Sequence, residues 1–213
     1  MRNGCAAFAA AALSSAALAC VGVASASTPF KQYTLPAAAA SQVSKAGTLT
    51  LSLPAEWRFS TAWSWGKTST GFRARSPWAS DPVHTSVFFS VGVALERAGT
   101  TLDSVRRDQS WAGSHDLWGP GTGVRRMFGD EYVSLPVGKA WRLTVIYIPP
   151  TSKGGWAART FERQYWLDRG LVRTTAGQRK ELFSLFVVGC RQDQCEAHNA
   201  QFEAVMRSIR LAA

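Results

Sequence analysis

The sequence predicts an α+β protein: an α/β/α sandwich with a central, mostly antiparallel sheet and a C-terminal helix packed on it. Three observations predict this class. Residues 182–188 are apolar on both strand faces, so this strand must be covered on both sides. Residues 196–210 repeat apolar side chains at helical spacing. The strands also follow one another at short, hairpin-like intervals, which favours antiparallel pairing.

The elements follow in chain order. Residues 48–54 alternate three leucines with polar residues and end at a proline, which is typical of a strand. The segments "EWRFST" and "TGFRARS" are weaker strands, and residues 84–96 show the clearest alternation. A helix is expected over 102–112, capped by the preceding threonines and Asp103. Further strands are predicted at 131–135, 139–147, 160–168, 171–175 and 182–188. The C-terminal helix is predicted from the spacing of Phe202, Val205, Met206 and Ile209.

The first 26 residues have the layout of a secretory signal. Arg2 is followed by an uncharged run from Cys5 to Ala26, and Ala24-Ser25-Ala26 supplies a cleavage site of small residues. The same run is long enough for a membrane anchor, and a lipid-modified Cys20 is a third alternative. Cleavage near Ala26 is the interpretation that the alanine-rich composition favours.

The mature chain divides into a flexible spacer over 27–46, rich in Ala, Ser, Thr and Pro, and a single domain over 47–213. Cleavage removes Arg2 and no acid, so the formal charge falls from +10 to +9. A basic surface outside the cytoplasm favours anionic envelope polymers or a protein partner over nucleic acid. No membrane span is expected after cleavage, and the oligomeric state stays open.

Two cysteines remain in the mature chain, Cys190 and Cys195. In an oxidising compartment they are expected to form a disulfide on a strand-to-helix turn. The spacing C-x-x-x-x-C does not match the redox motif C-x-x-C. A zinc site would need two further ligands, and His198 is the only close candidate. We therefore predict a local staple.

Several segments together resemble the PsbP-like family, which includes exported bacterial proteins of the DcrB type. The resemblance lies in "LSLPAEW", a helix beginning "TLDSV", the hairpin "VSLPVGKAWRLTVIY" to "RQYWLDRGLVRTT", and the closing "FEAVMRSIRL". It spans residues 48–211. The resemblance implies the same α/β/α sandwich, used as a binding or accessory module without catalytic residues to carry over. This sequence differs in its disulfide and in Trp-rich insertions at 60–80 and 111–126.

Motifs for catalysis are weak. "GKTS" at 66–69 lacks the first glycine of a phosphate loop. His84, His115 and His198 show no metal-binding spacing, so no metal or cofactor is predicted. His115 and Asp116 beside Ser114 are the residues that an envelope-acting hydrolase would use, and this is the alternative function.

Nine tryptophans are unusual for this length, and most lie on or beside predicted loops. With neighbouring arginines they could form a stacking surface for a glycan or peptide, but the favoured interpretation is that they cap the ends of the sheet core. The candidate ligand-binding residues are Trp63, Trp65, Arg73, Arg75, Trp78, Trp111, Trp118, Arg125 and Arg126. The sequence thus predicts an exported, non-enzymatic binding or accessory protein of the bacterial cell envelope.

Overall fold

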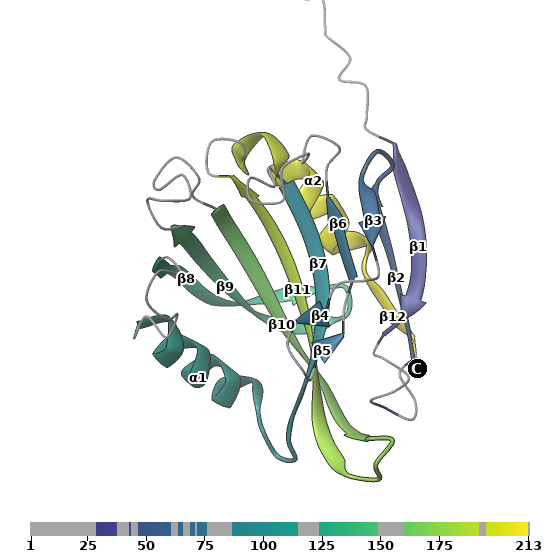
Figure 1. The fold of residues 1–213 in the computed structure, drawn as a ribbon, viewed down its shortest axis with the longest axis vertical. Coiled ribbons are helices and arrows are strands. Elements are labelled where there is room, and N and C mark those ends of the chain that lie inside the picture. The colour runs from purple at the N-terminus through teal and green to yellow at the C-terminus, as the bar shows by residue number, and fades with distance from the viewer. Residues whose placement is uncertain are drawn as a thin grey trace, which may run out of the picture.

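The computed structural model describes residues 29–37, 43, 47–60, 64–65, 69–70, 72–75, 87–114, 124–148, 160–191 and 195–212. Two helices and twelve strands lie in this part of the chain (Figure 1). Their bounds are β1 (Phe30–Pro36), β2 (Thr48–Pro54), β3 (Arg58–Ser60), β4 (Ser64–Trp65), β5 (Ser69–Thr70), β6 (Phe72–Arg75), β7 (Val87–Arg97), α1 (Leu102–Ser114), β8 (Val124–Leu135), β9 (Gly138–Ile148), β10 (Thr160–Arg173), β11 (Arg179–Arg191), α2 (Cys195–Ser208) and β12 (Arg210–Ala212).

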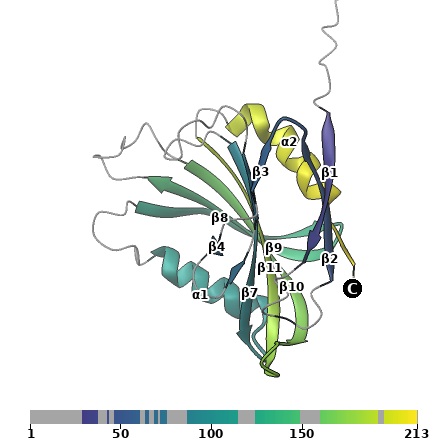
Figure 2. The same ribbon diagram turned by 45° about the vertical axis from the view of Figure 1, so that its right-hand side comes forward.

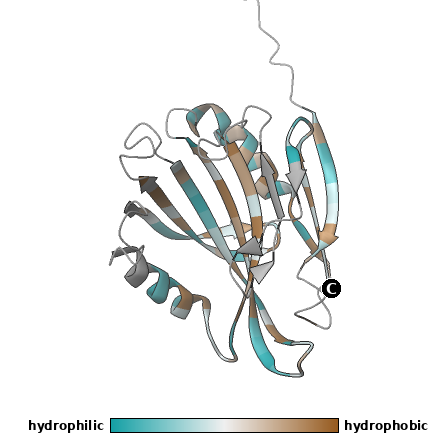
Figure 3. Ribbon diagram, in the orientation of Figure 1, coloured by the Kyte–Doolittle hydropathy of each residue, from teal (hydrophilic) through white to brown (hydrophobic). Residues whose placement is uncertain are grey.

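The main sheet has seven strands in the order β3-β6-β7-β11-β10-β9-β8. Every neighbouring pair is antiparallel, as the short strand spacing predicted. The long strands β7, β11, β10 and β9 form its centre, where the hydrophobic residues are buried. The hairpin joining β10 and β11 projects from the body and is hydrophilic (Figure 3).

A second sheet of three strands, in the order β1-β2-β12, packs beside α2 (Figures 1 and 2). Alternate residues of β2, which are Leu49, Leu51 and Leu53, are at most 1% exposed. They join α2 in one hydrophobic cluster with the main sheet. Ser208 fastens the helix to this sheet, since its Oγ accepts a hydrogen bond from Ser52 N at 2.8 Å.

Both faces of the main sheet are covered, as the strand at 182–188 requires (Figure 2). On one face, Phe183, Leu185 and Val187 pack in a cluster that includes Val105 of α1. On the other, Phe186 and Val188 pack with Phe202 and Val205 of α2 and with β2. The α/β/α arrangement is therefore confirmed, and the second sheet adds to the layer that contains α2.

The spacer predicted over 27–46 is wrong in part. Residues 30–36 form β1, which pairs along its whole length with β2. Ala37 and Val43 are buried, at 4% and 2% exposed. The apolar pattern did not reveal this strand, because backbone hydrogen bonds to the edge of β2 hold it and five of its seven residues are exposed.

Other boundaries also differ from the prediction. The two strands expected at 160–168 and 171–175 form one strand, β10, with a bulge between Asp168 and Leu171. Gly170 adopts φ of 78° there, and its N–H donates to Asp168 Oδ1 at 2.7 Å. The glycine therefore bends the strand instead of ending it. At α1, Thr101 Oγ1 accepts a hydrogen bond from Ser104 N, which confirms the predicted cap.

Neither α1 nor α2, the helices in the described part of the chain, is long and apolar enough to cross a membrane.

Candidate binding site beside the disulfide

Cys190 and Cys195 form a disulfide between the end of β11 and the first residue of α2, with their Cα atoms 5.3 Å apart. This confirms the predicted staple. Cys190 is buried, and Cys195 is partly exposed. The bridge fixes the start of α2 against the end of β11, a central strand of the main sheet.

A pocket opens next to this disulfide, between the sheet and α2. The cavity itself has a volume of about 30 Å³, and about 250 Å³ is reached when the open space at its mouth is included. Its floor and walls come from three elements: β10, β11 and α2. The lining residues are Phe161, Arg163, Val188, Cys190, Cys195, Asn199 and Phe202.

Arg163 and Asn199 supply the long polar side chains of this pocket, one from β10 and the other from α2. Neither makes a hydrogen bond or ion pair with another residue that the structure describes. Their neighbours on α2 are partnered: His198 Nδ1 lies 2.8 Å from Gln201 Oε1, and Glu203 pairs with Arg207 at 4.0 Å. A guanidinium and an amide are thus available to a ligand.

The apolar surface continues beyond the pocket. Phe128 sits at the bulge of β8 between Met127 and Gly129 and is 61% exposed. Its ring centroid lies 6.3 Å from that of Phe161 in the pocket. The bulge therefore places an exposed aromatic ring beside the pocket lining, where it can extend the contact area for an apolar ligand.

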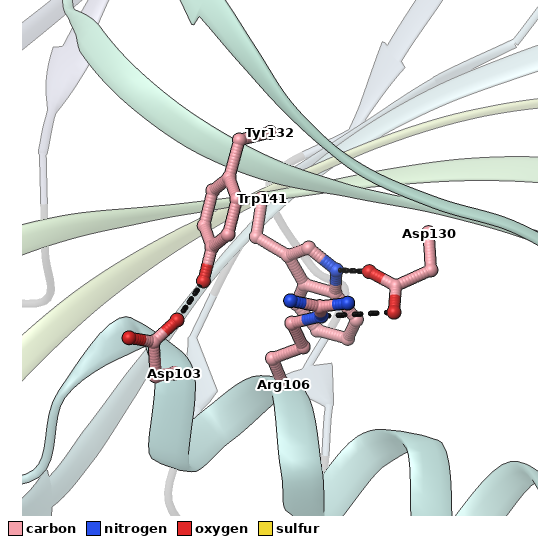
Figure 4. A network of polar contacts seen from close by, with 5 residues as sticks. All are labelled: Asp103, Arg106, Asp130, Tyr132 and Trp141. Carbon is pink, nitrogen blue, oxygen red and sulfur yellow. Dashed lines mark hydrogen bonds and ion pairs between the residues drawn. The ribbon is translucent and has the colours of Figure 1, made fainter.

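A polar network on the opposite face joins α1 to β8 and β9 (Figure 4). Arg106 Nε donates to Asp130 Oδ2 at 2.9 Å, and Trp141 Nε1 donates to Asp130 Oδ1. Tyr132 donates to Asp103, and this hydrogen bond raises the pKa of Tyr132. The Lys139 ammonium lies 4.1 Å from the Tyr132 ring centroid. These side chains use one another as hydrogen-bond and charge partners. We therefore infer that the network holds α1 on the sheet.

The predicted aromatic and basic loop residues are not tested by the structure. Trp63, Trp78 and Trp118 lie outside the described residues. The others lie on described backbone, but their side chains are outside the description. They are Trp65 on β4, Arg73 and Arg75 on β6, Trp111 on α1, and Arg125 and Arg126 on β8.

The alternative hydrolase site is likewise untested. His115 and Asp116 lie outside the described residues, and Ser114 is the last residue of α1. His84 is also outside them, whereas His198 lies on α2 as predicted. Within the described part of the chain, no group of three or more His, Cys, Asp or Glu side chains could hold a metal ion.

Sequence reasoning missed the pocket. It identified the two cysteines and assigned Phe202 to the core, but it did not connect them with Phe161, Arg163 or Asn199. The available signal was the alternation in β10, which puts Phe161 and Arg163 on one face. Only the pairing of β10 with β11 shows that this face meets α2.

Comparison with known proteins finds similarity of structure only. No family model and no curated protein matches the sequence. LpqN of Mycobacterium tuberculosis aligns with a TM-score of 0.54 at 11% identity, covering 86% of this chain and 92% of LpqN. Cyanobacterial PsbP (CyanoP) of Synechocystis aligns with a TM-score of 0.56 at 11% identity, covering 90% and 96%. The resemblance inferred from the strand and helix pattern is thereby supported, and the chain has the PsbP-like fold.

Proposed function

We propose that this protein is exported and acts as a non-enzymatic binding or accessory protein of the bacterial cell envelope, with an anionic partner. The observation that carries the proposal is the pocket beside the disulfide. It presents an unpaired cation and an amide above an apolar floor, and this combination can bind a ligand without any catalytic group.

Three further features support the proposal. The mature chain predicted from the signal pattern carries a formal charge of +9, which attracts anions. The Cys190–Cys195 disulfide is of the kind that persists outside the cytoplasm. LpqN, which shares the fold, is involved in cell envelope biogenesis.

Export is tested by expressing the full chain in a bacterial host and sequencing the amino terminus of the protein recovered outside the cytoplasm. We expect the mature chain to begin near Ser27 and to contain no free thiol at Cys190 or Cys195. An intact Met1 in a cytoplasmic fraction would contradict the proposal.

Binding is tested by retention of residues 27–213 on phosphatidylglycerol vesicles and on isolated cell-wall polymer. We expect retention at low salt and release near 1 M salt, where the Debye length falls to about 3 Å. Phosphatidylcholine vesicles serve as the uncharged control. Equal retention at low and high salt, or on both lipids, would refute an electrostatic partner. A pull-down from envelope fractions, with Trp111 and Trp118 replaced by alanine as comparison, tests the predicted loops.

A further inference from the structure

The pocket beside the disulfide brings together two polar side chains that the fold itself leaves unused. Arg163 comes from β10 and Asn199 from the second turn of α2, and both line the cavity. No hydrogen bond or ion pair joins either side chain to another described residue. The rest of the lining is aromatic, aliphatic or disulfide sulfur. A few convergent polar groups in an otherwise apolar pocket are typical of a small-molecule site.

The charges around the pocket favour an anion. Cys195, the first residue of α2, lies in the lining, so the partly positive N-terminus of this helix meets the cavity. Three acidic residues are sequence neighbours of residues that line the pocket, and among the described residues none of them pairs with Arg163. Glu203 pairs with Arg207 at 4.0 Å, and Glu196 is exposed. Glu162 precedes Arg163 on the strand and therefore points to the opposite face, where it accepts a hydrogen bond from Gln164.

The size of the cavity and the charge of its one arginine restrict the chemical class of the anion further. The cavity itself has a volume of about 30 Å³, room for roughly two waters, and the figure of about 250 Å³ includes open solvent at its mouth. The cavity therefore admits the charged group of a ligand, and a ring or branched side chain has to lie across its mouth. A planar carboxylate matches the fork of a single guanidinium and carries one charge. A phosphate monoester carries about −1.5 to −2, which one arginine would leave partly uncompensated against Phe161 and Phe202.

We propose that this pocket binds a small organic carboxylate carrying an aromatic or branched apolar group. The carboxylate enters the cavity and is held by Arg163 and the Asn199 amide, while the apolar group lies across the mouth against Phe161 and its neighbour Phe128. The Cys190–Cys195 bridge keeps α2 at the distance from β10 that this contact needs. The inference rests on the proposed function and gives the anionic ligand a site and a chemical class.

The experiment is a calorimetric or NMR titration of the disulfide-bonded chain with N-acetylphenylalanine. N-acetylphenylalaninamide removes the charge and N-acetylglycine removes the ring, so both are expected to bind at least about tenfold more weakly. A short peptide ending in phenylalanine, compared with its C-terminal amide, distinguishes a chain end from a free acid. If the free-carboxylate peptide binds as well as the small acid, the natural ligand is a chain end. If only the small acid binds, it is a free acid.

Substitutions of the two polar lining residues test whether they bind the carboxylate. Arg163→Gln is expected to weaken binding by about tenfold or more, and Asn199→Ala by less. Arg107→Gln is the matched control, because it removes the same charge from an exposed residue of α1 on the opposite face of the sheet. Circular dichroism and thermal unfolding verify that each variant folds. Unchanged affinity in folded Arg163→Gln, or equal losses in Arg163→Gln and Arg107→Gln, would overturn the proposal.

A second measurement does not depend on the variants. A ligand seated against Cys190 and Cys195 should slow reduction of the disulfide by dithiothreitol in the wild type but not in Arg163→Gln. Absence of protection at saturating acid would contradict this location. The two proposals fail separately. If the wild type is retained on anionic envelope material but does not bind the acid, the pocket inference fails alone. If it binds the acid without salt-sensitive retention, the envelope proposal fails and the site stands.

Discussion

Gly189 on β11 lies directly opposite Phe88 on β7, and the structure predicts that no larger residue fits there. A Cβ added to Gly189 would lie 2.3 Å from Phe88 Cζ and 2.4 Å from Cε1. It would also lie 3.1 Å from the backbone oxygen of Phe161 on β10. The Phe88 ring is 5% exposed and packed in the cluster beneath α1, so it cannot move aside freely.

Gly189→Ala is therefore expected to lower the free energy of unfolding by about 1–3 kcal/mol, the usual cost of overpacking a core. Phe88→Ala alone removes the ring and is expected to cost about 3–5 kcal/mol. In the double variant the obstacle is absent, so the alanine at 189 should add little further cost. The two changes should then differ from additivity by about 1–3 kcal/mol in the favourable direction.

The measurement is urea unfolding of the wild type, the two single variants and the double variant, monitored by circular dichroism and fluorescence. Gly129→Ala is the matched control, because its added Cβ would meet Thr144 Oγ1 at an ordinary 3.5 Å. We expect this control to be neutral or stabilised by about 0.4–1 kcal/mol, since alanine restricts the unfolded chain. Additive costs in the double variant, or equal effects of Gly189→Ala and Gly129→Ala, would refute the steric argument.

Three other changes test the framework, each by urea unfolding. Ser208→Ala should cost about 1–3 kcal/mol, because the partly buried Ser52 N–H loses its acceptor at 2.8 Å; an unchanged midpoint would show that this contact does not fasten α2. Replacing both Cys190 and Cys195 by alanine should cost about 2 kcal/mol, the entropy of a loop with a sequence separation of 5, and the chain should still fold. Burial raises the pKa of Tyr165. The unfolded chain therefore ionises first, so stability is complete below pH 10 and falls as pH rises toward the folded pKa. Tyr165→Phe should make this alkaline loss smaller, and identical pH slopes would contradict the assignment.

Strands of both sheets and the two helices could be predicted because their signals are local. Alternation marks β2 and β7, and the spacing of Phe202, Val205 and Met206 marks α2. The threonine cap of α1 is a contact within four residues. The burial of Leu182–Val188 on both faces also required helices on both sides, and the clusters around α1 and α2 confirm it. These features depend on the order of residues alone.

β1 and the bulge of β10 could not be predicted in this way. β1 is held by backbone hydrogen bonds to β2, and every residue except proline carries the same backbone donor. At Arg169-Gly170, a turn that ends the strand and a bulge that bends it need the same glycine conformation. Which of the two forms depends on whether β11 continues to pair with the chain beyond Gly170. The sequence pattern is the same in both cases.

The sequence by itself determined the fold class, the disulfide and the basic charge, since each follows from residue type and spacing. Only the tertiary structure decided where a ligand could bind. Arg163 and Asn199 are separated by 36 positions, and they line one pocket because β10 pairs with β11 and the disulfide anchors α2 at the end of that strand. Sheet register and helix docking set this proximity, and they depend on contacts between residues distant along the chain.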